Sequence, residues 1–209
     1  MRIALIHALR HSPPPIMEAF ARLWPEPNLV NILDDSLSSD LACDGALTPA
    51  MTDRFLRLAA YAVDTGAEAI LFSCSAFGPC IEACAAAFPG MPVLKPNEAM
   101  IEECSAYGNR VALLATFAPT VESMLPEFPP SLTVTPTLIQ GALAALDAGD
   151  GATHDRLVLE AASALPDCDV VALAQFSMSH LAGRAAAASG KPVLTTPDSA
   201  VRKLRRLMS

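Results

Sequence analysis

One cysteine stands where an apolar run gives way to a helix, a position that can make a thiol chemically useful. Cys74 lies in Ser73-Cys-Ser-Ala-Phe-Gly-Pro79, directly after a predicted buried strand. Backbone amides at a helix N-terminus stabilise a thiolate over a thiol, and with the Ser75 hydroxyl they can also bind a carboxylate. The alternative interpretation is a buried cysteine in a turn. The segment therefore offers a candidate proton-transfer group beside a candidate anion site.

A second segment repeats this one about a hundred residues later but differs at the key position. The run from Gly66 to Cys74 reads Gly-Ala-Glu-Ala-Ile-Leu-Phe-Ser-Cys, and the run from Asp167 to Gln175 reads Asp-Cys-Asp-Val-Val-Ala-Leu-Ala-Gln. The alignment places Gln175 opposite Cys74, and a glutamine amide does not act as an acid or a base near neutral pH. A duplicated fold would thus set one reactive thiol across a cleft from a side chain that cannot exchange protons.

Strands alternate with helices through both halves of the chain, which predicts an α/β fold. We expect two similar Rossmann-like parallel sheets related by pseudo-twofold symmetry, with the active site in the cleft between them. The first half is expected to span residues 1–97 together with a C-terminal helix at 196–209, and the second half residues 98–195. Strands are predicted at 2–7, 28–33, 68–73, 91–94, 110–115, 131–135, 169–173 and 192–194, helices at 16–23, 49–63, 77–88, 97–106, 119–128, 152–165, 181–189 and 197–207, and a polar loop at 34–45.

Polar residues follow several of these strands, and ligands of open parallel sheets bind beyond the carboxyl ends of the strands. Thr116 and Thr120 flank a predicted helix start, where they could hold an anionic oxygen or simply cap the helix. No glycine-rich phosphate-binding pattern follows any strand, so no nucleotide cofactor is expected. The candidate substrate-binding residues are His7, Ser75, Ala76, Thr116, Thr120, Gln175, Phe176 and Ser177.

Bulk composition excludes several other classes of protein. The chain of 209 residues is 52% hydrophobic and 17% charged, yet no apolar run is long enough to predict a membrane span. The net charge of −8 argues against a nucleic-acid partner. Six cysteines without a Cys-x-x-Cys pair, and four scattered histidines, predict neither a disulfide framework nor a metal site. Reduced, mostly buried thiols in a cytoplasmic protein are the simplest interpretation.

The chain resembles the aspartate/glutamate/hydantoin racemase superfamily over nearly its full length. The resemblance rests on Val111-Ala-Leu-Leu-Ala-Thr116 with Thr120-Val-Glu-Ser123, on the Cys74-Ser-Ala76 turn, and on the repeated Pro-Val-Leu. It implies two pseudosymmetric α/β domains, no cofactor, a small-molecule carboxylate as substrate and a homodimer. It also implies two cysteines on opposite faces of the substrate carbon, with Cys74 as the first-domain thiol. Ser75 and Ala76 then match the carboxylate-binding turn, and Thr116 and Thr120 the second-domain motif that holds substrate.

Gln175 departs from that pattern, because the superfamily usually carries its second cysteine there. Symmetric two-thiol racemisation is therefore not expected; Ser177, His180 and His7 are the other candidates for a second proton-transfer group. Arylmalonate decarboxylases of the same superfamily use a single cysteine to protonate an enediolate, although theirs lies in the second domain. Three hypotheses follow: a racemase-type enzyme acting through Cys74, a one-cysteine decarboxylase or lyase, and a non-catalytic binder of small acids.

Overall fold

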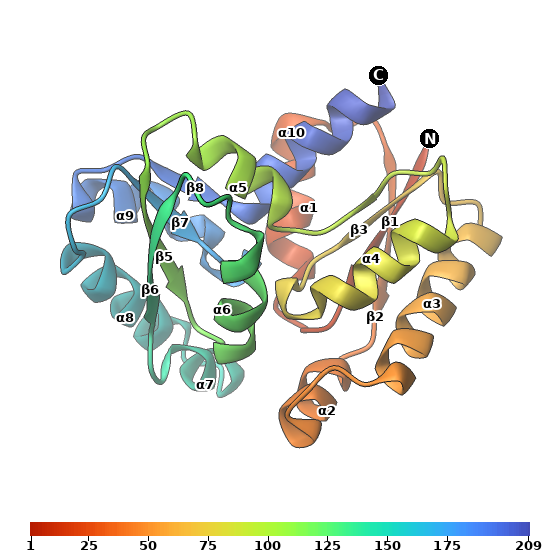
Figure 1. Cartoon of the computed structure of the whole chain (residues 1–209), viewed down its shortest axis with the longest axis horizontal. Helices are drawn as coiled ribbons and strands as arrows, with labels where there is room; N and C mark the ends of the chain where they lie inside the picture. The colour runs from red at the N-terminus through yellow and green to blue at the C-terminus, as the bar shows by residue number, and fades with distance from the viewer.

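Two four-stranded parallel sheets form the framework of the protein. The computed structural model describes residues 1–209, and Figure 1 shows the two sheets side by side, each flanked by helices. The strand order is β2-β1-β3-β4 in one sheet and β6-β5-β7-β8 in the other, which confirms the predicted α/β class with two similar halves. The strands are β1 (Arg2–His7), β2 (Asn28–Leu33), β3 (Ala69–Phe72), β4 (Val93–Leu94), β5 (Arg110–Ala115), β6 (Thr133–Leu138), β7 (Val170–Leu173) and β8 (Val193–Thr195).

Helices cover both faces of each sheet, as the continuous apolar strands require. One face of the first sheet packs on α2, α3 and α4 and the other on α1 and α10, while the second sheet lies between α5 with α6 and α8 with α9. The α-helices are α1 (Pro13–Leu23), α2 (Leu37–Asp44), α3 (Pro49–Asp64), α4 (Gly78–Ala87), α5 (Glu98–Cys104), α6 (Ala118–Met124), α7 (Ala142–Asp147), α8 (Gly151–Ser163), α9 (Ala182–Ser189) and α10 (Thr196–Met208). Short 3₁₀ helices η1 (Ser75–Phe77), η2 (Leu125–Glu127) and η3 (Phe176–Leu181) follow β3, α6 and β7. No helix is long and apolar enough to span a bilayer.

The duplication extends to strand register and to the residues that start the strands. Ile3 pairs with Ala69 in the first sheet as Val111 pairs with Val170 in the second. The backbone N–H of Arg2 donates to Glu68 at 2.9 Å, and that of Arg110 donates to Asp169 at 3.0 Å. The structure therefore equates Glu68 with Asp169, and six residues further on it equates Cys74 with Gln175.

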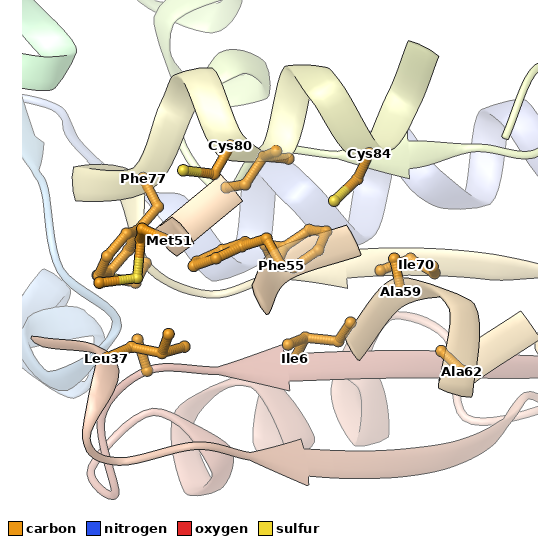
Figure 2. Close-up of a cluster of buried hydrophobic side chains, with 14 of the residues drawn as sticks. Ile6, Leu37, Met51, Phe55, Ala59, Ala62, Ile70, Phe77, Cys80 and Cys84 are labelled. Atoms are coloured by element: carbon orange, nitrogen blue, oxygen red, sulfur yellow. The ribbon is translucent and has the colours of Figure 1, made fainter. Parts of the chain in front are cut away.

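The hydrophobic cores of the two halves show how most of the cysteines are used. Phe55 of α3 lies 4.9 Å from Phe77 and 5.4 Å from Phe72 between ring centroids. Figure 2 shows Cys80 and Cys84 of α4 pointing into this cluster as small apolar side chains. Cys104 and Cys168 are buried in the cores of the second half, and all six cysteines are free. The prediction that most of the thiols are buried is confirmed, since only Cys43 is exposed.

The segment at 34–45 is not the loop that its polar composition predicted, because it contains α2. Leu37 and Leu41 are buried one turn apart, and Gly45 ends the helix with a φ of +70°. Arg54 of α3 holds the helix from outside through ion pairs to Asp34 and Asp40, both at 2.6 Å. Two buried leucines and one bridging arginine are enough to order a segment that is otherwise rich in serine and aspartate.

The second half also departs from prediction between β5 and α8. The helix expected at 119–128 is α6 followed by η2, and the strand expected at 131–135 runs from Thr133 to Leu138. The short α7, which was not predicted, is bounded by Gly141 and Gly149, both with positive φ. Glycines are typical of turns and loops, so Gly141 and Gly149 on either side of this segment give no sign of a helix between them.

The chain crosses between the halves at α5 and again at α10. Met100 and Ile101 of α5 lie in the core of the second half, whereas Val201 and Leu204 of α10 pack with α1 in the core of the first. Figure 1 shows α10 running alongside α1. Arg202 of α10 donates to Glu103 of α5 at 2.9 Å and so ties the two crossing helices together.

Candidate active site

A small, largely enclosed cavity lies where the carboxyl ends of β1, β3, β5 and β7 meet. It encloses about 10 Å³, which is room for about one water molecule. Residues of both sheets contribute to its wall, so the cavity lies between the halves, as two related sheets would place it. The lining residues are Leu9, His11, Ser12, Ser73, Cys74, Ser75, Thr116, Phe117, Thr120, Leu143, Ala174, Gln175, Phe176 and Ser177.

All but two of the residues predicted from sequence line this cavity. Ala76 instead faces a neighbouring open groove of about 640 Å³ between α4 and α6. His7 is fully buried behind the wall and contacts Ser73 rather than the cavity. His180 is exposed and pairs with Asp155 of α8 at 2.9 Å, so it is not placed to replace the missing thiol.

Cys74 is a thiol rather than the thiolate that its place before a helix suggested. Its side chain is 8% exposed, and this burial raises the pKa of the thiol to about 11. Hydrogen bonds from the Ala76 amide and the Ser38 side chain act in the opposite direction but are outweighed. A protonated thiol facing a small cavity is suited to donating a proton.

The opposite wall carries two buried polar atoms that have no partner within the protein. Gln175 Oε1 accepts a hydrogen bond from the Thr116 backbone N–H at 2.9 Å, which fixes how the amide is oriented. Gln175 Nε2 and Thr116 Oγ1 are both buried and both lack a partner. Leaving such a group unpaired costs about 1–3 kcal/mol, so each favours a ligand that supplies the missing bond.

A chain of hydrogen bonds runs behind Cys74 from the cavity to the surface. His7 Nε2 lies 2.9 Å from Asn31 Oδ1, and His7 Nδ1 lies 2.8 Å from Ser73 Oγ. Because Asn31 Oδ1 can only accept, His7 carries its proton on Nε2 and accepts the Ser73 hydroxyl proton at Nδ1. Burial lowers the pKa of His7 to about 4, which keeps the imidazole neutral and this wall uncharged at physiological pH.

The neutral state of His7 makes stability sensitive to acid. Between its ordinary pKa of 6.5 and the folded value of about 4, the unfolded chain binds a proton that the folded chain does not. Above pH 6.5, His7 is neutral in both states and does not reduce the free energy of unfolding. Between pH 6.5 and about 4, the free energy of unfolding falls as the pH is lowered. We expect a loss of about 2 kcal/mol in the free energy of unfolding between about pH 7.5 and pH 5, measured by urea denaturation. The His7→Gln variant should lose this part of the dependence and the exposed control His180→Gln should keep it; equal slopes in the two variants would refute the assignment.

Different contacts close the two sides of the cavity. On one side, which we call the mouth, the lining includes the apolar residues Leu9, Phe117 and Leu143, and His11 Nε2 lies 2.9 Å from Asp147 Oδ1 of α7. This pair joins the loop after β1 to the second half. A substrate larger than water requires these groups to separate.

On the other side, α6 and η2 are fastened to the first half. Ser123 Oγ donates to the Ser75 carbonyl at 2.7 Å, and Lys95 lies 3.0 Å from Glu127. Asn97 also donates to Glu127. These buried and half-buried bonds leave the mouth beside His11 as the route by which the cavity can open.

The cavity residues that sequence reasoning missed were available from the repeat itself. Counting from the matching strand starts Arg2 and Arg110, Ser12 corresponds to Thr120 and Leu9 corresponds to Phe117. Ser12 and Thr120 both lie at the start of a helix, and both line the cavity. Applying the repeat beyond the cysteine segment would have identified Ser12 and Leu9. Leu143 belongs to α7, which holds the place of α2 in the order of elements, and neither helix was predicted from the sequence, so this residue carried no such signal.

Two similar parallel sheets with a cavity between them define a pseudosymmetric α/β protein. Solved structures with this fold include allantoin racemase from Klebsiella pneumoniae, with a TM-score of 0.76 and 16% identity over 100% of this chain and 87% of that one. Glutamate racemase from Bacillus anthracis matches with a TM-score of 0.73 and 13% identity, over 99% and 80%. Arylmalonate decarboxylase matches with a TM-score of 0.64 and 20% identity, over 99% and 92%.

The fold expected from the sequence resemblance is thus confirmed, since these solved structures are racemases and a decarboxylase of that superfamily. No protein-family model matches the sequence, and no curated protein is significantly similar to it. At these identities the likeness concerns the fold, and the chemistry has to be argued from the cavity.

Proposed function

We propose that the protein is a cofactor-independent enzyme of the racemase type that acts on the α-carbon of a small carboxylate through one thiol, Cys74. The observation that carries the proposal is that a buried thiol, Cys74, and the Gln175 amide line the same small cavity, one from each half. Cys74 exchanges a proton with the α-carbon from one face. Gln175 cannot do so from the other, because its amide does not titrate.

The cavity wall carries hydroxyl groups but no Arg, Lys, Asp or Glu side chain, which supports a substrate with few charges. Ser12, Ser75, Thr116 and Thr120 provide hydroxyl groups, and no Arg, Lys, Asp or Glu side chain lines the wall. A carboxylate can be held by hydroxyls and by the amides at the helix starts. A second carboxylate would find no Arg or Lys side chain in the lining, so dicarboxylic amino acids are disfavoured as substrates.

One thiol predicts proton exchange on a single face. We expect the enzyme in D₂O to exchange the α-hydrogen of its substrate while the configuration is retained. Proton NMR of enantiopure amino acids and hydantoins detects the exchange, and chiral chromatography of the same samples reports configuration. Exchange with inversion at matching rates would show a second base and contradict the one-thiol mechanism.

Decarboxylation is the second candidate, favoured by the protonated state of Cys74. Loss of carbon dioxide creates a carbanion equivalent, so the enzyme needs a proton donor and no base in the resting state. A thiol with its pKa raised to about 11 is such a donor.

Prochiral disubstituted malonates in the same NMR screen test this candidate. If the malonates stay unchanged while an amino acid or hydantoin exchanges its α-hydrogen, decarboxylation is eliminated. Stabilisation by such acids without any turnover would instead support the non-catalytic binder.

A homodimer in the cytoplasm, with no nucleic-acid or membrane partner, completes the proposal. It rests on the family resemblance, the acidic charge and the free thiols.

A further inference from the structure

The amide that replaces the expected second thiol is built to bind an oxygen atom of the ligand. Its carbonyl oxygen is already committed to the Thr116 backbone N–H at 2.9 Å, so its NH₂ group is the end left free. Nε2 is buried without a partner, and so is Oγ1 of Thr116, whose residue is only 7% exposed. Two unpaired polar atoms from adjacent strand ends therefore belong to the same wall of the cavity.

The chemistry of these atoms specifies the group that meets them. An amide NH₂ can only donate, and a hydroxyl can donate as well, so the complementary group is a hydrogen-bond acceptor. No acidic or basic side chain of the lining lies on this wall, which suits a carbonyl or carboxylate oxygen rather than a phosphate or a cation.

We propose that Gln175 Nε2 and Thr116 Oγ1 together bind the substrate oxygen that gains negative charge during the reaction. This inference rests on the proposed function at Cys74. In proton exchange, the ionised form of Cys74 takes the α-proton onto Sγ; in decarboxylation, the carboxylate leaves as carbon dioxide. In both cases the electron pair of the broken bond forms the C=C bond of the enolate, and the carbonyl π electrons move to the oxygen held by the two donors. As the enolate collapses, the α-carbon takes a proton from Cys74 Sγ, which is left as a thiolate and, after decarboxylation, regains a proton from water.

Gln175 is therefore a catalytic hydrogen-bond donor rather than the inert remnant of a lost base. The hydrogen bond from its NH₂ group becomes stronger as negative charge develops on the substrate oxygen. A bond that is stronger in the transition state than in the bound substrate is what lowers the barrier. The same bond to Thr116 that fixes Oε1 holds Nε2 in place before the substrate arrives.

Binding in a Cys74→Ala background tests the assignment without requiring turnover. The probe is phenylacetate, a monocarboxylate whose ring suits the apolar mouth residues, titrated into ¹⁵N-labelled protein and followed by NMR of the side-chain amides. We expect the Gln175 amide resonances to shift on titration.

Gln175→Glu keeps an acceptor for the Thr116 amide but replaces the NH₂ donor by a charged oxygen, and it should weaken phenylacetate binding at least tenfold. Gln175→Met, uncharged and of similar length, should weaken it less.

The matched control is Gln140→Glu, the same change at the other, exposed glutamine of the chain. It should leave the dissociation constant unchanged. Binding by the Gln175→Glu variant that equals the control, or no shift of the Gln175 amide at the highest soluble probe concentration, would overturn the assignment. If binding depends on Gln175 but the protein catalyses neither exchange nor decarboxylation, the role of Gln175 in binding is supported and the proposed function is refuted. If turnover is unchanged in the Gln175→Glu variant, the proposed function is supported and the role of Gln175 is refuted.

Discussion

Replacing Cys74 by alanine is expected to lower the rate of α-proton exchange, or of decarboxylation, by roughly 10²–10⁴-fold. The buried thiol is the only cysteine that lines the cavity, whereas His7 lies behind Ser73 with its pKa lowered to about 4 and His11 is paired with Asp147 at 2.9 Å. The NMR exchange assay described above measures the loss directly.

A matched variant separates chemistry from folding. Cys84 of α4 is also a fully buried thiol, but it packs in the hydrophobic core of the first half. Cys84→Ala removes the same group with a similar cost in packing and should retain the exchange rate of the parent protein. Cys84→Ala serves as the reference for stability. If the Cys74→Ala variant keeps its activity, Cys74 is excluded as the proton-transfer residue.

Replacing Gln175 by cysteine is expected to produce the largest gain of a new activity. The matching registers of the two sheets put position 175 at the place equivalent to Cys74, so a thiol there would address the opposite face of the substrate carbon. We expect inversion of configuration, measured by chiral chromatography of an enantiopure substrate, to rise by roughly 10²-fold or more relative to the parent. The total exchange rate should fall, because the amide donor beside Thr116 is lost.

Gln175→Ser is the control for this substitution, since it removes the same amide but adds no titratable thiol. It should lose exchange without gaining inversion. Retained configuration in the Gln175→Cys variant, with exchange still proceeding, would mean that position 175 does not face the reacting carbon.

The sequence predicted the framework and most of the cavity because the same physical pattern occurs twice. Apolar strands such as Ile3–Ile6 and Val111–Ala115 end in polar residues, and the carboxyl ends of parallel strands gather at one edge. Cys74, Thr116, Thr120 and Gln175 were therefore found without the structure. The placement of Gln175 against Cys74 came from local repetition alone.

Other features depend on tertiary contacts that no local pattern shows. The order of α2 comes from Arg54, which is distant in sequence and pairs with Asp34 and Asp40. The protonation state of Cys74 was predicted in the wrong direction because its desolvation depends on how tightly the two halves close, whereas the helix amides are visible locally. The exclusion of His7 from the cavity likewise follows from the Ser73 side chain in front of it.

The near-absence of space around Cys74 also governs how the protein responds to thiol reagents. A thiol that is 8% exposed, protonated at neutral pH and enclosed beside about 10 Å³ of space is shielded from alkylating agents and peroxides. Exposed Cys43 is the residue that such reagents modify first. Slow labelling of Cys74 therefore measures how often the mouth between His11 and Asp147 opens, and a ligand that holds it shut should protect the thiol still further.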